Sequence, residues 1–363
     1  MAHPMTVLVT GAGGLLGAEV TARLTAAGHR VLALLHGTGD IVRNDGTRLT
    51  PGPGTLVPVT GDVTRPGLGL TAAEGHLART ADRIVHCAAV TDFGLPEEHY
   101  DSVNVHGTRH VLDLALVGRT PLVHLSTAYV CGERDGTVRE DELDTGGRPG
   151  NGYERSKLTA ETLVHEAAAD GLPVTVVRPS IITGAARTGR IRDFKTVYPV
   201  LKVFTSGLVR SAPGHYDAVL DLVPVDHVAD LVAEAALRFT DARGHTLHAV
   251  GHELTLRDFS DVLAEYPSLR VPRFVPPSAF SASALCGRER RYYDRVISLY
   301  APYFRRRVHF DTARTAAFSG RPAPTHGRTY LRRLLDHCLK AGYLGGPPPP
   351  RVPAARRTHG STQ

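Results

Sequence analysis

A tyrosine and a lysine stand four residues apart in the segment GNGYERSKLTAE, as Tyr153 and Lys157. Lysine is scarce in this chain, which otherwise uses arginine for its positive charges. Residues four apart lie on the same face of a helix, and a nearby ammonium lowers the pKa of a phenol. The pair therefore predicts a tyrosine that donates a proton to a developing alkoxide near neutral pH.

A strand-like run, PLVHLST, ends in two hydroxyl side chains, Ser126 and Thr127. A hydroxyl at the end of a strand is suited to hold the carbonyl oxygen of a substrate, which strengthens the interpretation of the tyrosine and lysine. Cys131 follows closely, but it comes after an apolar strand. We expect it to pack in the core rather than to act as a nucleophile.

The segment TVLVTGAGGLLGAEVTARL places a glycine-rich turn between a strand and a helix. Gly11, Gly14 and Gly17 follow a G-x-x-G-x-x-G spacing, whereas G-x-G-x-x-G fails because position 16 is leucine. Glycine allows a tight turn and a close approach to a pyrophosphate, which the free N–H groups at the helix start attract. The turn therefore predicts a dinucleotide site that includes Leu15 and Leu16.

The end of the second strand indicates which dinucleotide to expect. A carboxylate there favours NAD, and a basic residue accommodates the 2′-phosphate of NADP. This chain has His36 at the strand end, Asp40 four residues later and Arg43 beyond. We therefore expect NADPH, with NADH as the alternative. Asp62, followed by Val63 in the run GDV, is expected to meet the adenine amino group unless it is an ordinary turn aspartate.

The first half of the chain alternates apolar, β-branched runs with helix-like segments. Strands that are apolar throughout and separated by helices indicate a parallel sheet covered on both faces. We therefore expect an α/β fold: a Rossmann-type doubly wound parallel sheet with a smaller, mostly helical C-terminal substrate lobe. The expected strands are residues 6–10, 30–36, 56–62, 83–89, 121–127 and 173–180, and expected helices include residues 15–27 and 98–118.

The alternation of apolar strands and helices ends beyond the sixth strand, where a basic segment of mixed composition begins. We expect the Rossmann domain to comprise residues 1–186 plus about 218–252. The substrate lobe is expected to comprise about 187–217 plus 253–343. The Pro- and Arg-rich residues 344–363 cannot bury a core and are expected to be disordered.

Composition excludes several classes of protein. With 42% hydrophobic and 21% charged residues the chain is typical of a globular protein, and no apolar run is long enough to span a membrane. No secretory signal and no disulfide or zinc pattern is evident, so we expect a cytoplasmic protein. His106 and His110 lack a third ligand nearby, and we expect no metal.

The net charge of +6 comes from scattered arginines that are densest toward the C-terminus. Such a charge indicates either an ordinary solvated surface or attraction to an acidic partner or a phosphate-bearing substrate. Nucleic acid is not expected as a partner, because no basic helix or aromatic–basic motif accompanies the charge.

The motifs also occur in a specific order. The segments TGAGGLLG, GDV, HCAA, NVHGT, HLSTAYVCG, YERSK and VVRPSIITG, over roughly residues 5–250, resemble the extended short-chain dehydrogenase/reductases. Within that family, GDVTRPGLGL, STAYVCG and DLVPVDHVAD resemble the branch of thioester reductases and fatty acyl-CoA reductases.

The resemblance implies a catalytic set of Thr127, Tyr153 and Lys157, with Thr127 rather than Ser126 at the position of the active hydroxyl. It also implies that Asn104, in NVHGT, supports the lysine, often through water. The remaining cofactor contacts that the resemblance implies are Ala88, Ala89, Pro179, Ser180 and Ile181.

The implied reaction is an NADPH-dependent reduction that releases an acyl thioester as an aldehyde, with a further reduction to the alcohol left open. The thioester would be carried by coenzyme A or by an acidic acyl or peptidyl carrier protein, in the biosynthesis of a specialised metabolite or lipid. Two features depart from the branch. His36 stands where an arginine is usual, and nothing precedes the first strand, so the enzyme is expected to meet its carrier by diffusion.

The same residues also serve other activities of the family. A ketone or aldehyde reductase, or a nucleotide-sugar epimerase or dehydratase, is the alternative, and a non-catalytic cofactor-sensing protein is a further one. The second lobe would decide between them. Its aromatic residues 292–304, Tyr300 among them, are expected to form core or to line an acyl channel. The expected oligomeric state is a monomer or a homodimer.

Overall fold

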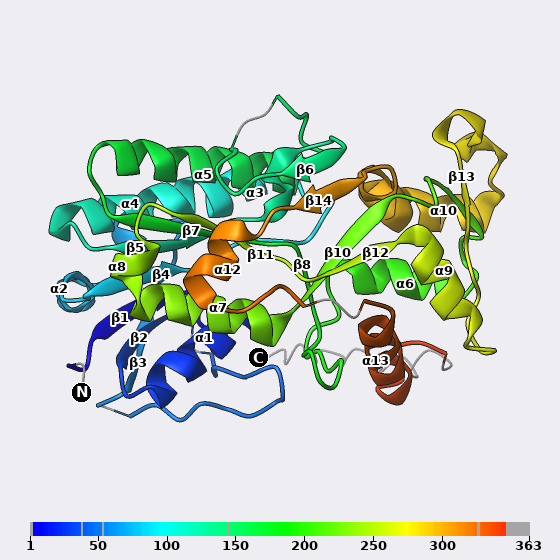
Figure 1. The fold of residues 1–363 in the computed structure, drawn as a ribbon. Coiled ribbons are helices and arrows are strands. Elements are labelled where there is room, and N and C mark those ends of the chain that lie inside the picture. Colours follow the sequence, from blue (N-terminus) through cyan, green and yellow to red (C-terminus); the bar gives the residue numbers. More distant parts are fainter. Residues whose placement is uncertain (1–2, 38, 53, 144–145, 325–326, 346–363) are drawn as a thin grey trace, which may run out of the picture.

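A computed structural model describes residues 3–37, 39–52, 54–143, 146–324 and 327–345. Its centre is a seven-stranded, wholly parallel sheet in the order β11-β7-β5-β4-β1-β2-β3 (Figure 1). The strands are β1 (Thr6–Thr10), β2 (Arg30–Leu35), β3 (Leu56–Thr60), β4 (Arg83–His86), β5 (Leu122–Leu125), β7 (Val174–Pro179) and β11 (Thr246–Ala249).

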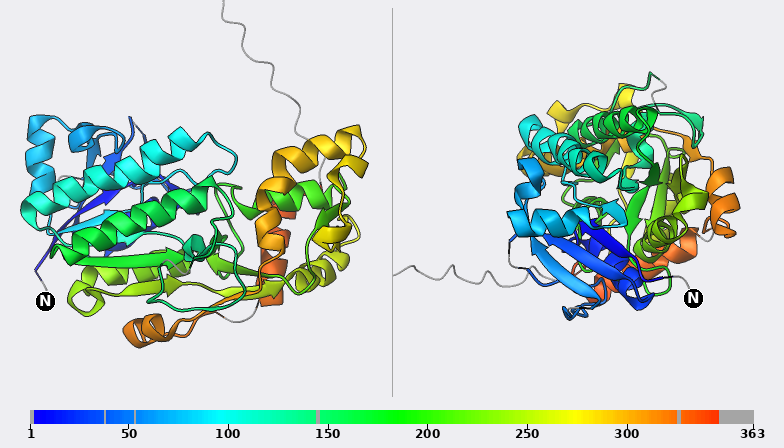
Figure 2. Two further views of the ribbon diagram at one scale, coloured as in Figure 1. Left: turned by 90° about the horizontal axis from the view of Figure 1, so that it is seen from above. Right: turned by 90° about the vertical axis from the view of Figure 1, so that its left-hand side faces the viewer.

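Helices cover both faces of this sheet, as the view from above in Figure 2 also shows. Helices α1 (Leu15–Ala26) and α7 (Val225–Leu237) pack on one face. Helices α2 (Ala72–Arg79), α4 (Gly107–Gly118) and α5 (Gly152–Ala169) pack on the other. The fold is therefore the doubly wound parallel α/β arrangement expected from the sequence.

Successive residues of each strand contribute to opposite faces of the sheet. Val7 and Val9 of β1 belong to the core under α1 and α7, whereas Leu8 belongs to the core under α2, α4 and α5. All three side chains are fully buried, which explains why the strand is apolar throughout. We call these two layers the sheet cores.

The strand order reverses between β1 and β4, because the chain leads outward from β1 to β2 and β3 and then returns to β4. In open α/β sheets such a switch point creates a crevice at the carboxyl ends of the strands. The glycine turn after β1 lies at this edge, and so does the hydroxyl pair after β5. The topology thus brings segments distant in sequence to one place.

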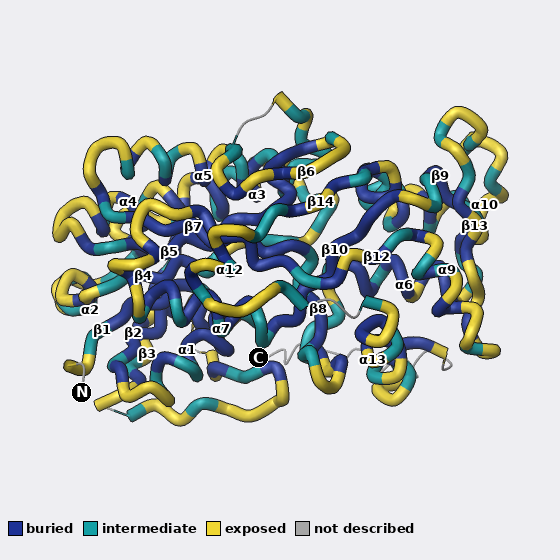
Figure 3. The backbone as a smooth tube through the Cα atoms, viewed as in Figure 1, coloured by how far each residue is buried: buried dark blue, intermediate teal, exposed yellow. Residues whose placement is uncertain are grey.

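The rest of the chain forms a second body beside the sheet, on the right in Figure 1. Its core, the second core, is rich in aromatic residues, and Figure 3 shows the buried backbone continuing into it. The strands outside the large sheet are β6 (Gly136–Val138), β8 (Ile181–Thr183), β9 (Ser211–Pro213), β10 (Val219–Pro224), β12 (His252–Thr255), β13 (Arg273–Val275) and β14 (Val308–Phe310). They pair as the sheet β12-β10-β8 and as the pairs β13-β9 and β14-β6.

The remaining helices lie mostly in this second body or around its border with the sheet. They are α3 (Glu97–Tyr100), α6 (Val197–Thr205), α8 (Phe239–Ala242), α9 (Leu256–Ala264), α10 (Gly287–Tyr292), α11 (Ser298–Tyr300), α12 (Ala313–Ser319) and α13 (Gly327–Lys340).

The segment from 218 to 252 contributes to both bodies. Strand β10 belongs to the three-stranded sheet, whereas α7 and β11 complete the Rossmann layers. The domain boundaries expected from the sequence stay a prediction. Leu344 of the expected disordered tail is buried in the second core, and residues 346–363 lie outside the described residues. In the described part of the chain, no helix is long and apolar enough to cross a membrane.

Candidate active site

A cavity of about 300 Å³ opens at the carboxyl edge of the sheet, between the sheet and the second core. It brings together residues that the sequence singled out from five separate segments. These are Gly11, Gly14, Leu15, Leu16, Gly17, Ala89, Thr127, Tyr153, Lys157, Pro179, Ser180 and Ile181.

The glycine turn requires glycine at two positions. Gly11 has a positive φ of 67°, and a Cβ there would lie 2.7 Å from the Cα of Ala88. A Cβ on Gly17 would lie 2.1 Å from the carbonyl oxygen of Gly11. The N–H of Gly14 closes the turn by donating to the same Gly11 oxygen at 2.9 Å. The turn therefore packs too tightly against Ala88 and against itself to accept a side chain at either position.

Helix α1 begins directly after this turn, with Gly14 at its N-cap and no side chain capping it. The first N–H groups of a helix have no partner within the helix and carry the positive end of its dipole. Leu15, Leu16 and Gly17 therefore present backbone donors to the cavity, which they line. The turn and the helix start together fit a pyrophosphate group.

The residues expected around the adenosine end lie outside the wall of this cavity. His36 is 87% exposed, and its Nε2 lies 3.9 Å from Oδ2 of Asp62. Asp62 accepts hydrogen bonds from the backbone N–H and the hydroxyl of Thr64. Arg43 pairs instead with Glu19 at 3.3 Å and with Asp45 at 3.6 Å. The structure thus places His36 with Asp62 and separates Arg43 from them.

Val63 has a structural partner that the sequence did not indicate. Its carbonyl oxygen lies 2.9 Å from Nδ1 of His110, and its side chain faces Gly107. His110 therefore anchors the loop after β3 onto α4. Among the described residues, no group of three or more His, Cys, Asp or Glu side chains is arranged to hold a metal.

Helix α5 positions the tyrosine and the lysine. Asn151 caps its N-terminus by accepting a hydrogen bond from the N–H of Glu154 at 2.9 Å, so that Tyr153 lies in the first turn. Lys157, one turn later, is 2% exposed and donates to the carbonyl oxygen of Leu125 at the end of β5. Both side chains line the cavity.

Thr127 and Ser126 point to different partners. The Thr127 hydroxyl lies close enough to the phenol of Tyr153 to lower its pKa, and it donates to the carbonyl oxygen of Pro179 at 3.3 Å. Ser126 instead donates to the buried carboxylate of Glu161. Thr127, rather than Ser126, is thus the hydroxyl that contacts the tyrosine.

The pKa of Tyr153 is raised, opposite to the direction expected from the sequence. Burial is the main cause, and the hydrogen bond with Thr127 only partly offsets it. Burial also lowers the pKa of Lys157 to about 8, although the carboxylate of Glu161 acts against it. Desolvation of the phenol outweighs the effect of the lysine charge on which the expected direction was based.

Asn104 holds the backbone near the site. Its side chain accepts from the N–H of Val90 at 2.9 Å, and donates to the carbonyl of Val90 at 3.1 Å and the hydroxyl of Ser156 at 2.9 Å. It lies in a π-helical segment, residues 101–106, between α3 and α4. The expected support of Lys157 through water stays a prediction, because the direct partners of Asn104 are the loop at Val90 and helix α5.

An aromatic wall faces the tyrosine from the opposite side. The ring of Phe93 lies 5.8 Å from Tyr153, 4.8 Å from Tyr300 and 5.9 Å from Tyr303, between ring centroids. All four rings line the cavity. The sequence analysis pointed to the aromatics near 300 but not to Phe93, because nothing in the local pattern links the two segments.

A buried ion pair connects the second body to the catalytic helix. Arg306 makes two hydrogen bonds to Glu154, at 3.0 and 2.9 Å, and the two side chains are 2% and 0% exposed. The guanidinium also lies over the rings of Tyr303 and Tyr129, 4.8 and 5.7 Å from their centroids. Sequence reasoning missed this pair, since its members are 152 positions apart.

A buried carboxylate lies behind the Ser180 wall of the cavity. Asp221 on β10 accepts hydrogen bonds from the hydroxyl of Ser180 and from the N–H of Gly251. Burial raises the pKa of Asp221 to about 6, although these hydrogen bonds act in the other direction. Burial likewise raises the pKa of the Cys131 thiol to about 11, as befits a packed rather than a nucleophilic cysteine.

Comparisons with known proteins show which family the chain belongs to. The family model described as “Male sterility protein” matches residues 9–232. The chain is 30% identical to the isonitrile lipopeptide synthase of Streptomyces coeruleorubidus over 95% of this chain and 25% of that protein. It is 27% identical to the probable fatty acyl-CoA reductase 4 of Arabidopsis thaliana over 58% of this chain and 55% of that protein. The chain thus spans about a quarter and about half of these two relatives.

Among solved structures, the terminal R domain from the myxalamid PKS-NRPS biosynthetic pathway is similar over almost its whole length. The TM-score is 0.77 at 28% identity, covering 96% of this chain and 94% of that one. The similarity therefore includes the second body as well as the sheet.

Proposed function

This chain belongs to the family described as male sterility protein, a family of NAD(P)-dependent oxidoreductases, and we propose that it reduces an acyl thioester to an aldehyde. The observation that carries the proposal is the contact between the Thr127 and Tyr153 hydroxyls at the wall of the cavity, between the glycine turn and the aromatic wall. The names of the similar proteins support a thioester rather than a ketone as the substrate.

The bound nicotinamide cofactor supplies a hydride to the carbonyl carbon of the thioester. Thr127 and Tyr153 hydrogen-bond the carbonyl oxygen, and Tyr153 donates its proton to that oxygen as negative charge develops there. The product is a hemithioacetal. Its carbon–sulfur bond then breaks, releasing an aldehyde and a thiol, and the hydroxyl proton passes to the departing sulfur. One hydride and one proton are consumed for each thioester.

Burial raises the pKa of Tyr153, so the phenol is protonated at neutral pH and has a proton to donate. The raised pKa also makes it a weaker acid, so donation depends on the negative charge that develops on the substrate oxygen. Lys157 is held at Leu125, one helical turn after the tyrosine, where its ammonium would bind the ribose of a bound cofactor and would favour the phenolate that remains after donation. Thr127 orients both the phenol and the substrate.

We propose NADPH as the preferred reductant. Two features support this: the end of β2 carries no carboxylate, and the imidazole of His36 there is exposed. We also propose that the acyl group arrives on the phosphopantetheine of a carrier protein or on coenzyme A. A net charge of +6 favours either anionic carrier.

The test is a steady-state assay of NADPH and NADH oxidation with one acyl group presented on coenzyme A and on carrier proteins. Aldehyde or alcohol release must be measured together with loss of reduced cofactor. We expect thioester-dependent oxidation with NADPH in excess of that with NADH. Turnover of ketones or nucleotide sugars, with no thioester consumed, would overturn the proposal and leave the family assignment intact.

A further inference from the structure

The segment between β8 and α6, residues 184–196, forms one side of the catalytic cavity, and we call it the strap. Four of its residues line the cavity: Ile191, Asp193, Lys195 and Thr196. The same cavity is lined by the glycine turn and by the first residues of α1. A dinucleotide seated on that turn would therefore have the strap as a neighbour.

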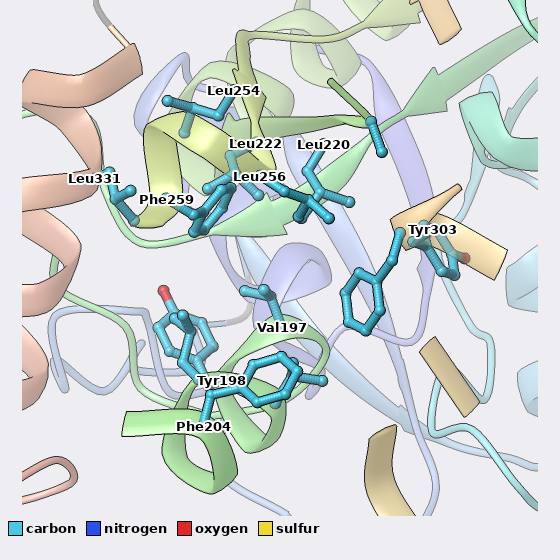
Figure 4. Close-up of a cluster of buried hydrophobic side chains, with 14 of the residues drawn as sticks. Val197, Tyr198, Phe204, Leu220, Leu222, Leu254, Leu256, Phe259, Tyr303 and Leu331 are labelled. Carbon is cyan, nitrogen blue, oxygen red and sulfur yellow. The ribbon is translucent and has the colours of Figure 1, made fainter. Parts of the chain in front are cut away.

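The strap is anchored in the second body. At its start, the N–H of Gly184 donates to the phenol oxygen of Tyr198 at 3.0 Å. Near its end, the ring of Phe194 stacks on that of Tyr343 with 4.1 Å between the centroids. The strap then continues into α6, and Figure 4 shows Val197 and Tyr198 of this helix among the side chains of the second core. Movement of the strap relative to the second body is thus restrained at both ends.

A hairpin that follows β2 reaches the strap from the seven-stranded sheet and its helices, which we call the first body. The hairpin comprises residues 41–49 and is closed by an antiparallel bridge between Val42 and Arg48. Its first side chain, Ile41, is buried in the sheet core that includes α1. The backbone N–H of Asn44 donates to Oε1 of Glu19, a buried residue of α1, at 2.9 Å. The hairpin is therefore fixed to the helix whose first turn fits a pyrophosphate.

The side chain of Asn44 joins the hairpin to the strap. Its Nδ2 donates to the carbonyl oxygen of Arg190 at 2.7 Å, and its Oδ1 accepts from the N–H of Arg192 at 2.9 Å. These two backbone groups flank Ile191, so the amide pairs with the strap much as the backbone of a neighbouring strand would. Asn44 is 6% exposed and Ile191 4%. Asn44 thus fixes the backbone of a residue that lines the cavity, and does so away from water.

The other contacts at this junction are more open to solvent. The guanidinium of Arg192 donates to the carbonyl oxygen of Val42, and the Arg192 side chain is 21% exposed. Lys195 pairs at 2.9 Å with Asp92, on the loop after β4, and both of these side chains are about half exposed. Exposed ion pairs contribute little to stability, because water competes for both charges. We therefore expect the two side-chain hydrogen bonds of Asn44 to contribute most to holding the strap against the first body.

We propose that Asn44 is a positioning residue that holds the strap closed beside the cofactor site, so that a nicotinamide dinucleotide enters and leaves only when this junction opens. Asn44 is not among the described residues that line the cavity, so it acts through the strap rather than by contact with the cofactor. The inference goes beyond the proposed function, because it requires a dinucleotide on the glycine turn but no particular acyl substrate.

Such a junction has a kinetic signature. If it closes in both the free and the occupied protein, association and dissociation of the cofactor are slowed together. A substitution that weakens the junction therefore raises both rates by the same factor and leaves the equilibrium affinity nearly unchanged. Loss of a residue that contacts the cofactor would instead raise the dissociation rate alone.

The test compares Asn44→Ala with Thr47→Ala. Thr47→Ala is the matched control, because Thr47 is an exposed residue of the same hairpin that hydrogen-bonds its neighbour Asp45. Stopped-flow mixing with NADPH gives the association rate from cofactor fluorescence, and displacement of bound NADPH by excess NADP⁺ gives the dissociation rate. NADH is measured in parallel. No thioester is present, so failure of the proposed thioester reduction would leave this test unaffected.

We expect both rates to rise about tenfold in Asn44→Ala, with Kd within about threefold of the wild type, because two hydrogen bonds that oppose opening are lost. Thr47→Ala should leave both rates unchanged. Arg192→Met removes a single hydrogen bond of the same junction and should raise both rates about threefold, which decides the matter if Asn44→Ala does not fold.

Unchanged rates in both junction variants would overturn the inference. A rise in the dissociation rate alone, with a matching loss of affinity, would also overturn it, because that result would assign Asn44 to the cofactor site itself.

Discussion

The sheet cores and the second core of this molecule are built from different side chains. Among the described residues, the buried members of the two sheet cores are almost all valine, leucine, isoleucine and alanine, with Phe239 and Phe318 as the aromatic exceptions. The second core contains a large share of the buried tyrosines and phenylalanines, including Tyr129, Tyr198 and Tyr303. Regular layers of helix on parallel sheet suit aliphatic residues, whereas irregular segments need large rings to fill the space between them.

The proposed function assigns a different kind of ligand contact to each of the two regions. At the cofactor edge, the turn at Gly11 and Gly17 exposes backbone and excludes side chains. At the substrate edge, the rings of Phe93, Tyr300 and Tyr303 form the wall. Backbone recognition suits a cofactor that does not vary, and side-chain recognition allows a substrate pocket to change without altering the fold. Tyr153 stands where the two regions meet.

The largest effect is expected at that junction. Tyr153→Phe removes the proton donor, so kcat should fall by roughly 10²- to 10⁴-fold while affinity for NADPH stays within about twofold. Tyr266→Phe is the control, because its hydroxyl bonds Asp336 at the surface, away from the cavity. Stopped-flow measurement of cofactor oxidation would test this. A Tyr153→Phe enzyme that kept more than a tenth of its rate would mean that another group donates the proton.

The next largest effect is expected at the buried ion pair that connects the two regions. Arg306→Leu leaves the carboxylate of Glu154 buried without its partner, which should lower the free energy of unfolding by about 3–5 kcal/mol. Arg328→Leu, which removes an exposed ion pair with Asp258, should change it little. Urea titration followed by circular dichroism measures both. Equal effects of the two substitutions would show that the buried pair does not hold the second body to α5.

At the cofactor edge, a methyl group added to one glycine should weaken cofactor binding, whereas a methyl group added to a neighbouring glycine should be tolerated. Gly17→Ala would put a Cβ 2.1 Å from the oxygen of Gly11, whereas the nearest atom to a Cβ on Gly13 is a Leu35 methyl at 3.4 Å. We expect Gly17→Ala to weaken NADPH binding by at least about tenfold, from the 1–3 kcal/mol typical of overpacking. Gly13→Ala should bind within about threefold of the wild type. Fluorescence titration with NADPH measures the affinity of each variant. If the turn did not face the cofactor, Gly17→Ala would not bind NADPH more weakly than Gly13→Ala.

The last expected effect is a pH dependence, which is absent below about pH 8 and grows above it. The pKa of Lys157 is lowered to about 8, so its ammonium is present below that pH and lost as pH rises through it. If only the charged lysine is active, kcat/KM should fall about tenfold for each unit above pH 8. Lys157→Arg keeps its charge at these pH values and should give a flat profile at a lower level. A wild-type profile that stayed flat to pH 10 would contradict this role of the lysine.

The sequence predicted best the features that depend on short spacings. The G-x-x-G-x-x-G turn and the Tyr153–Lys157 pair each lie within one turn or helix, so their geometry follows from local structure. The parallel sheet followed from strands apolar throughout, and the structure confirms it. The helix expected over 98–118 forms as α3, a π-helical segment and α4, a subdivision that residue pattern alone does not show.

Features that depend on distant contacts could not be predicted in this way. The pairing of Glu154 with Arg306 and the position of Phe93 opposite Tyr153 arise only when separate segments pack together. The direction of the pKa shift of Tyr153 was wrong for a related reason, since burial is a property of the whole fold. The role of Arg43 at the cofactor stays a prediction, and its ion pair with the buried carboxylate of Glu19 on α1 is another contact between distant segments.

One measurement tests the central claim most directly. NADPH carrying deuterium at the transferable position of its nicotinamide would be incubated with the enzyme and an acyl thioester, and the product examined by mass spectrometry. The account predicts an aldehyde with one deuterium on its carbonyl carbon, or an alcohol with two deuteriums on its carbinol carbon, and at least about a hundredfold slower formation of either with Tyr153→Phe. Product without deuterium, or thioester loss by hydrolysis to the acid, would contradict it.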